Sequence, residues 1–93
     1  MPTITSTGTY TKDTAGNFDF LARSDRPRLL RFSGSSVACS IQTKDDTGTF
    51  AEEDNGSITT LPDSALLVTN AELNLVVTGS PNFNVTCEYV KYV

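Results

Sequence analysis

Short segments in which apolar and polar residues alternate, separated by turn-forming residues, constrain the fold of this chain more than any other feature. The segments are residues 18–22, 37–42, 73–77 and 83–89. Alternation with a period of two is typical of a strand that buries one face. Turn signals recur roughly every 8–12 residues, and no segment favours a helix of about ten residues or more. The pattern predicts an all-β fold, a small antiparallel β-sandwich or barrel of about seven to nine short strands.

The composition agrees with a fold built from strands. Threonine is the most abundant residue, with 14 copies among 93 residues, and Val, Ile, Thr, Phe and Tyr together number 32. β-branched and aromatic residues are the strand formers. A chain of this length has enough residues for one hydrophobic core and not for two. We therefore expect residues 13–93 to form a single β domain.

Residues 1–12 differ from the rest because they alternate small polar residues. Only Ile4 and Tyr10 in this segment can bury much apolar surface. We expect an extended, Thr-rich N-terminal arm that adds a strand to a sheet edge, either of its own domain or of a neighbour. The first seven residues have neither the basic nor the apolar region of a secretory signal, so we expect synthesis in a reducing cytosol.

Three turns are expected to join adjacent strands as hairpins. Residues 29–41 and 73–89 both run strand, Gly-Ser turn, strand. The Asp-Asn-Gly sequence at 54–56 is the strongest hairpin signal, because Asn-Gly accepts the positive φ angles of a type I′ turn. Residues 58–61 are then the return strand, and 65–69 are a short strand or connector.

The sequence excludes several kinds of chemistry. The chain has no histidine, which excludes Ser-His-Asp and Cys-His nucleophile systems and HExxH zinc sites. In a reducing cytosol Cys39 and Cys87 are expected to be free, buried thiols, and no neighbouring charge lowers their pKa enough for catalysis. Six glycines form no phosphate-binding loop. We expect a protein that is not an enzyme, with no cofactor and no metal.

The net charge and the hydropathy of the sequence limit the kinds of partner that we expect this chain to bind. The net charge of −4 argues against nucleic acid, which needs a basic surface. No apolar run approaches the roughly 20 residues of a membrane span. We therefore expect no nucleic-acid partner and no membrane partner.

Two stretches of opposite charge are the candidate interface. The basic stretch spans residues 23–31 and the acidic stretch spans residues 45–63. Opposite stretches allow copies to associate head to tail, which closes into a ring or trimer. The alternatives are a solvated rim and, for the acidic stretch, a calcium site. The residues expected at the interface are Arg23, Arg26, Arg28, Arg31, Asp45, Asp46, Glu52 and Glu53, with Ile4 and Tyr10 from the arm.

Several stretches resemble small β-rich structural proteins of tailed bacteriophages. They are Arg28-Leu29-Leu30-Arg31-Phe32-Ser33-Gly34-Ser35, then Val37-Ala38-Cys39-Ser40-Ile41-Gln42, an Asp-Asp-Thr-Gly-Thr-Phe turn, Asp54-Asn55-Gly56-Ser57-Ile58-Thr59, and Leu73-Asn74-Leu75-Val76-Val77-Thr78-Gly79-Ser80 followed by Phe83-Asn84-Val85-Thr86. The resemblance covers roughly residues 28–90. It implies a virion component with no catalytic residues.

The resemblance implies a capsid decoration or cement protein that binds the shell and its own copies through surface contacts. Its expected partners are the major capsid protein or another virion protein, and a homo-oligomer, with a trimer favoured. Its expected location is the virion, after synthesis in the host cytoplasm. The alternatives are a tail or fibre module, and a soluble β-sandwich module that binds carbohydrate or calcium.

Overall fold

The computed structural model describes residues 2–91, except for the side chains of Asp54 and Asn55. Within that range it contains eight strands and one short 3₁₀ helix, which agrees with the expected all-β fold. The elements are β1 (Thr3–Ile4), β2 (Gly8–Tyr10), η1 (Asp19–Leu21), β3 (Arg28–Ser36), β4 (Cys39–Lys44), β5 (Phe50–Ile58), β6 (Asp63–Leu67), β7 (Leu73–Val77) and β8 (Asn82–Tyr89).

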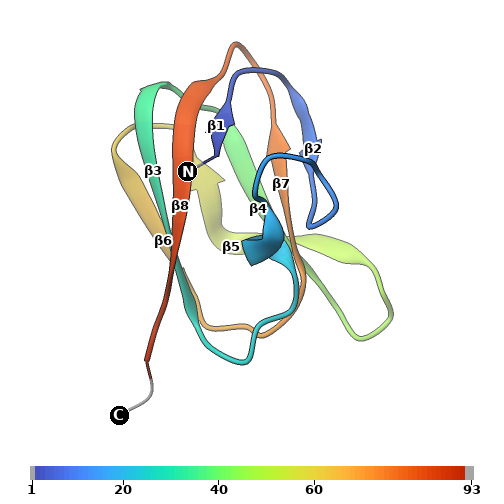
Figure 1. The fold of residues 1–93 in the computed structure, drawn as a ribbon. Coiled ribbons are helices and arrows are strands. Elements are labelled where there is room, and N and C mark those ends of the chain that lie inside the picture. The colour runs from blue at the N-terminus through green and yellow to red at the C-terminus, as the bar shows by residue number, and fades with distance from the viewer. Residues whose placement is uncertain (1, 92–93) are drawn as a thin grey trace.

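The strands form two antiparallel sheets that pack as a sandwich (Figure 1). Sheet A has the order β1-β8-β3-β6, and sheet B has the order β2-β7-β4-β5. The chain changes sheet at almost every connection, and only β4 and β5 are consecutive strands that pair with each other. Two interleaved four-stranded sheets connected in this order form a jelly roll. The expected antiparallel sandwich is therefore confirmed, in preference to a barrel.

One core fills the space between the sheets. Alternate residues of the strands point inward, as the period-two pattern predicted. The rings of Phe32 and Phe83 lie 6.1 Å apart between centroids, in a tilted arrangement favourable for aromatic pairs. Each fully buried large apolar side chain contributes about 1.5–3 kcal/mol. Core side chains that are at most 1% exposed include Leu30, Phe32, Ile41, Ile58, Leu75, Phe83 and Val85.

The extended N-terminal arm is not present, because residues 3–10 supply edge strands of their own domain. β1 pairs with β8, where Ile4 lies opposite Phe83, and β2 pairs with β7. Ile4 is only 1% exposed. The ring of Tyr10 packs 5.1 Å from the ring of Phe18. Of the two alternatives for this segment, the structure shows the sheet edge of its own domain, and Ile4 and Tyr10 anchor β1 and β2 to the core of this chain.

The two expected Gly-Ser hairpins are arches that carry the chain from one sheet to the other. β3 pairs with β8 and β4 pairs with β7, so β3 and β4 belong to different sheets. A Cβ atom at position 34 would lie 2.6 Å from the carbonyl oxygen of Asn82. The paired strands β3 and β8 approach so closely here that only glycine fits. Alternation along each strand is the same in a hairpin and in an arch. The alternating pattern therefore predicted these strands correctly, but the hairpin pairing that we inferred from it is wrong.

Two further local expectations differ from the structure. Residues 18–22 contain the 3₁₀ helix η1 rather than a strand, and it directs Phe20 and Leu21 into the core. The Asp-Asn-Gly sequence at 54–56 lies within β5, which continues to Ile58. The β4–β5 register shifts between Ser40 and Gln42, so extra residues of β5 form a bulge. A Cβ atom at Gly56 would lie 2.9 Å from the carbonyl oxygen of Ile41, so close packing, not a turn, explains this glycine.

Arg28 is the largest departure from the sequence analysis, because it lies in the interior and not at an interface. It is 0% exposed, on the same inward side of β3 as Leu30. Burial lowers its pKa, against opposing contributions from Cys87 and Tyr89. A buried guanidinium requires several acceptors. Its nitrogens donate to four carbonyl oxygens, of Phe20 at 2.9 Å, Ala22 at 2.6 Å, Thr69 at 3.2 Å and Ala71 at 2.6 Å.

Replacing Arg28 should destabilise the fold far more than replacing the exposed Arg31 on the same strand. Arg28→Ala leaves four loop carbonyls without their donor and opens a cavity, so we expect a loss of about 3 kcal/mol or more in the free energy of unfolding. Arg31→Ala removes only an exposed ion pair with Glu88 and should cost less than about 1 kcal/mol. Urea unfolding of both variants measures the difference. Equal losses would contradict a structural role for Arg28.

Candidate functional site

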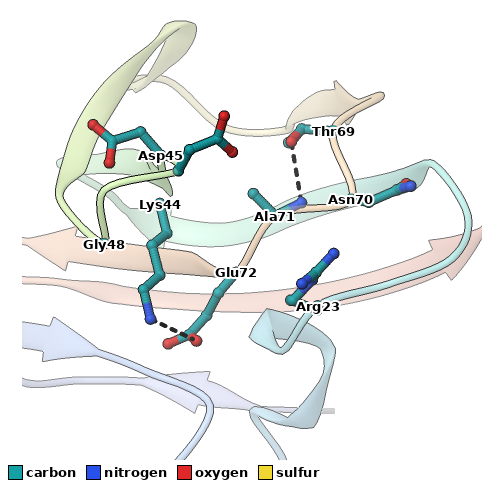
Figure 2. Close-up of a pocket in the computed structure, with 9 residues that line it drawn as sticks. Arg23, Lys44, Asp45, Gly48, Thr69, Asn70, Ala71 and Glu72 are labelled. Atoms are coloured by element: carbon teal, nitrogen blue, oxygen red, sulfur yellow. Dashed lines mark hydrogen bonds and ion pairs between the residues drawn. The ribbon is translucent and has the colours of Figure 1, made fainter.

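Arg23, Asp45 and Asp46 lie around one pocket at an end of the sandwich (Figure 2). Its volume is about 490 Å³, and its walls are the segment after η1, the β4–β5 turn and the β6–β7 connection. Residues from the basic and the acidic stretch therefore meet within one chain. Head-to-tail association of copies stays a prediction, because residues of opposite charge at one pocket neither require nor exclude a contact between chains.

The pocket is polar, and two of its carboxylates, Asp45 and Glu72, have partners in the local structure. Asp45 Oδ1 accepts hydrogen bonds from the Thr47 amide at 2.9 Å, the Thr47 hydroxyl at 2.6 Å and the Thr49 amide at 3.0 Å. The bond from the Thr47 side chain contributes most to lowering the pKa of Asp45. Lys44 Nζ lies 3.8 Å from the Glu72 carboxylate. Asp45 thus acts as the acceptor that closes a tight turn.

This arrangement suits neither a metal ion nor an apolar ligand. Among the described residues no group of three or more Cys, Asp or Glu side chains could hold a metal ion. Calcium needs six to eight oxygen ligands, so the structure gives the calcium alternative no support. Ligand pockets are lined mainly by apolar and aromatic groups, whereas no residue that lines this pocket is aromatic.

The other charged residues of the expected interface lie on different surfaces. Arg31 pairs with Glu88 at 3.0 Å, with both side chains about three-fifths exposed, at 60% and 62%. Glu53 lies on β5 and accepts a hydrogen bond from the Thr43 hydroxyl at 3.3 Å. Arg26 and Glu52 are exposed. With Arg28 in the core and Arg23 at the pocket, the four arginines do not form one basic face.

Sequence reasoning missed an exposed apolar edge at β6. Leu66 is 59% exposed and Val68 is 73% exposed. On the outer face of sheet A, Leu66 lies opposite the half-buried Leu29. The segment 65–69 was expected to be a strand or connector, but its position at a sheet edge depends on the topology. The alternation of Ala65, Leu66 and Leu67 does not reveal which leucine faces solvent.

β6 is the least protected of the four sheet edges. β1 has two residues and β2 has three, too short for extended pairing. β5 carries Glu52 and Glu53 and has a bulge. Short length, charges and bulges are the means by which sheet edges avoid pairing with other chains. β6 has five residues, of which Asp63 is the only charged one, and it pairs with β3 alone within residues 2–91.

A hollow of about 260 Å³ runs beside the backbone of β6. It is lined by residues 64–67 and by Glu53 from β5. Glu53, on the neighbouring edge of sheet B, therefore forms one wall of this hollow. We take β6, together with the exposed side chains of Leu66 and Val68, as the candidate functional site, and call it the β6 edge.

The two cysteines are free thiols, as expected. Cys39 is buried on β4, and Cys87 is half-buried on β8. Burial raises the pKa of Cys39 to about 12. Burial also raises the pKa of Cys87, with the nearby charge of Arg28 acting in the opposite direction. Only the thiolate is strongly nucleophilic, so neither thiol has the character of a catalytic group at neutral pH.

In comparisons with known proteins, no family model, curated protein or solved structure matched the chain. Among the described residues, the structure has no helix of sufficient length and apolar character to cross a bilayer.

The raised pKa of Cys39 predicts an alkaline loss of stability. Below about pH 9 the thiol is protonated in both the folded and unfolded states, so its contribution is fully present. Between about pH 9 and 12 the unfolded thiol ionises while the buried one does not, and stability falls. Urea midpoints at about pH 8 and 10.5, in reducing buffer, should drop less for Cys39→Ala than for the unaltered chain. Equal decreases in the urea midpoint of the variant and of the unaltered chain would contradict this prediction.

Proposed function

We propose that this chain is a virion structural protein of a tailed bacteriophage, a capsid decoration protein that works by surface contact. The observation that carries the proposal is the jelly-roll strand order combined with one unprotected edge. Jelly rolls recur in viral capsid proteins, in lectins and in cupins. Because one fold serves many functions, the fold alone does not identify the function, and the properties of the surface must also be considered.

The surface supports a contact role better than a ligand-binding one. The chain has no histidine, and the pocket that Arg23 and Asp45 line is polar, with an ion pair between Lys44 and Glu72 in its lining. By contrast, the β6 edge offers unpaired backbone and two exposed apolar side chains. Binding that occurs only on the assembled shell stabilises the shell by RT ln(1 + [L]/Kd) per site. Such a protein needs contact area and no reaction chemistry.

The test uses particles of the virus that encodes the chain, purified with and without its gene. We expect the protein to be present in the complete particles. Purified protein added to particles that lack it should sediment with them and saturate at a fixed number of copies. Particles that lack it should lose their DNA at lower temperature than complete ones. Absence of the protein from purified particles, with no binding on addition, would show the proposal to be wrong.

The same particles distinguish a decoration protein from a tail or fibre module. Heads and tails separated on a gradient are probed with an antibody to the chain. A decoration protein fractionates with heads, whereas a tail or fibre module fractionates with tails. Signal confined to tails would replace the capsid assignment while keeping the virion role.

A further inference from the structure

We propose that the pocket at the end of the sandwich is a preformed site for a small zwitterion whose ammonium and carboxylate groups are several bonds apart. A short peptide with both termini free has this chemistry. We call this pocket the end pocket, and its lining is residue 23, residues 44–46 and 48, and residues 69–72. The inference goes beyond the virion role and does not rest on it, because contact with a shell requires no small ligand.

Hydrogen bonds between the three walls fix the shape of the end pocket. The Ser24 amide donates to the Asn70 carbonyl at 3.1 Å, which joins the segment after η1 to the β6–β7 connection. The Lys44 amide donates to the Glu72 carbonyl at 3.0 Å, which joins the end of β4 to the same connection. Contacts within the chain therefore hold the walls in place, so a ligand does not have to order them on binding.

Arg28 strengthens this arrangement from inside the fold. Its guanidinium donates to the carbonyl oxygens of Ala22 at 2.6 Å, Thr69 at 3.2 Å and Ala71 at 2.6 Å. Thr69 and Ala71 line the end pocket, and Ala22 directly precedes Arg23. Because Arg28 is 0% exposed, water does not compete for these bonds. Surface connections are usually mobile, whereas these two are tied to one buried cation.

Three polar side chains of the lining are available to a ligand, those of Arg23, Asp46 and Asn70. All three are exposed, and none has a hydrogen bond or ion pair with another described residue. Arg23 supplies a positive charge, Asp46 supplies a negative charge, and the Asn70 amide both donates and accepts. A small number of polar groups in a pocket is what fixes the orientation of a ligand.

The opposite signs of the two available charges select the class of ligand. A guanidinium pairs with a carboxylate through two parallel hydrogen bonds, and a carboxylate accepts from an ammonium group. Figure 2 shows Arg23 and Asp45, the neighbour of Asp46, on opposite sides of the pocket. The two charges of the ligand must therefore be separated, as they are in a peptide and not in a single α-amino acid. The volume of about 490 Å³ lies within the range of ligand sites.

Other classes of ligand match this lining less well. A simple anion would meet three carboxylates, and a simple cation would meet two basic side chains. A neutral saccharide would offer no opposite charge to Arg23 or Asp46, and no aromatic side chain lines the pocket for a sugar ring to stack on. A zwitterion offers each of these two side chains a group of the opposite charge.

The test is a titration of the isotope-labelled chain with the dipeptide alanyl-alanine at low ionic strength, followed by NMR. Exposed ion pairs are weak, so we expect a dissociation constant of about 1–10 mM. Changes in amide shift should be confined to residues 22–24, 44–48 and 69–72. The N-acetylated dipeptide lacks the cation and the dipeptide amide lacks the anion, so each should bind about threefold more weakly or worse.

Two variants assign the charges of the ligand to their partners. Arg23→Gln should weaken binding of the dipeptide about three- to fivefold and leave binding of the dipeptide amide unchanged, because that probe has no carboxylate. Asp46→Asn should weaken binding of the dipeptide by a similar factor and leave binding of the N-acetylated dipeptide unchanged. Both side chains are exposed without a partner in the described chain, so neither substitution removes a contact on which the fold depends.

Arg26→Gln and Glu52→Gln are the matched controls. They remove one positive and one negative charge at exposed positions outside the lining, and both should bind the dipeptide like the unaltered chain. The spectrum of each variant without peptide verifies that the fold is kept. Absence of binding up to about 50 mM dipeptide would overturn the proposal. Equal binding of either capped dipeptide, or equal effects of the pocket and control variants, would overturn it as well.

Discussion

The four hydrogen bonds of Arg28 hold together the end of the sandwich at which the pocket lies. In a jelly roll the connections cross between sheets, so their carbonyl groups crowd over the core where water cannot satisfy them. The Arg28 guanidinium lies on the inner side of sheet A. It donates hydrogen bonds to carbonyl groups of the connection after η1 and of the connection between β6 and β7, which are more than 40 residues apart in sequence. Its hydrogen bonds include no carboxylate, so carbonyl dipoles alone stabilise its charge, and its buried Nε has no hydrogen-bond partner. The β6–β7 segment, and with it the end of the β6 edge, is positioned by this residue.

The sequence was informative where a property is local. The alternation at Leu73, Leu75 and Val77 correctly predicted both a strand and its buried face, because the pleat forces successive side chains to opposite sides. Arg28 obeys the same rule, since it shares its side of β3 with Leu30 and Phe32. Its charge led to the opposite prediction. The chain places a cation at a core position because the four carbonyls that receive it come from segments distant in sequence, and no local pattern reveals such acceptors.

Pairing and edges are properties of the whole topology, and this limits what can be predicted about the site. Gly34 lies within β3, opposite Phe83 of β8, and Gly56 lies within β5 beside a register shift, although both sequences are typical of turns. The charged stretches seemed continuous along the chain, yet the fold sends Arg23, Arg28 and Arg31 to an end pocket, the core and an outer face. The exposure of Leu66 depends on β6 being the last strand of sheet A. The order of the strands in each sheet depends on contacts between distant segments, and the sequence of one chain does not reveal these contacts.

The distribution of charge explains how such a chain stays soluble while keeping one edge available. Asp46 and Glu52 contribute to the net negative charge of the chain. Asp46 lies in the turn between β4 and β5, and Glu52 lies on β5, the edge strand of sheet B. That charge discourages pairing through β5, whereas β6 itself carries only Asp63 and has Glu53 of β5 beside it. A short edge gives a weak contact between free molecules, because the buried area falls below that of stable interfaces. In the proposed decoration role, the shell would hold its bound copies at a far higher effective concentration than free chains reach, so even a weak contact would add to binding there.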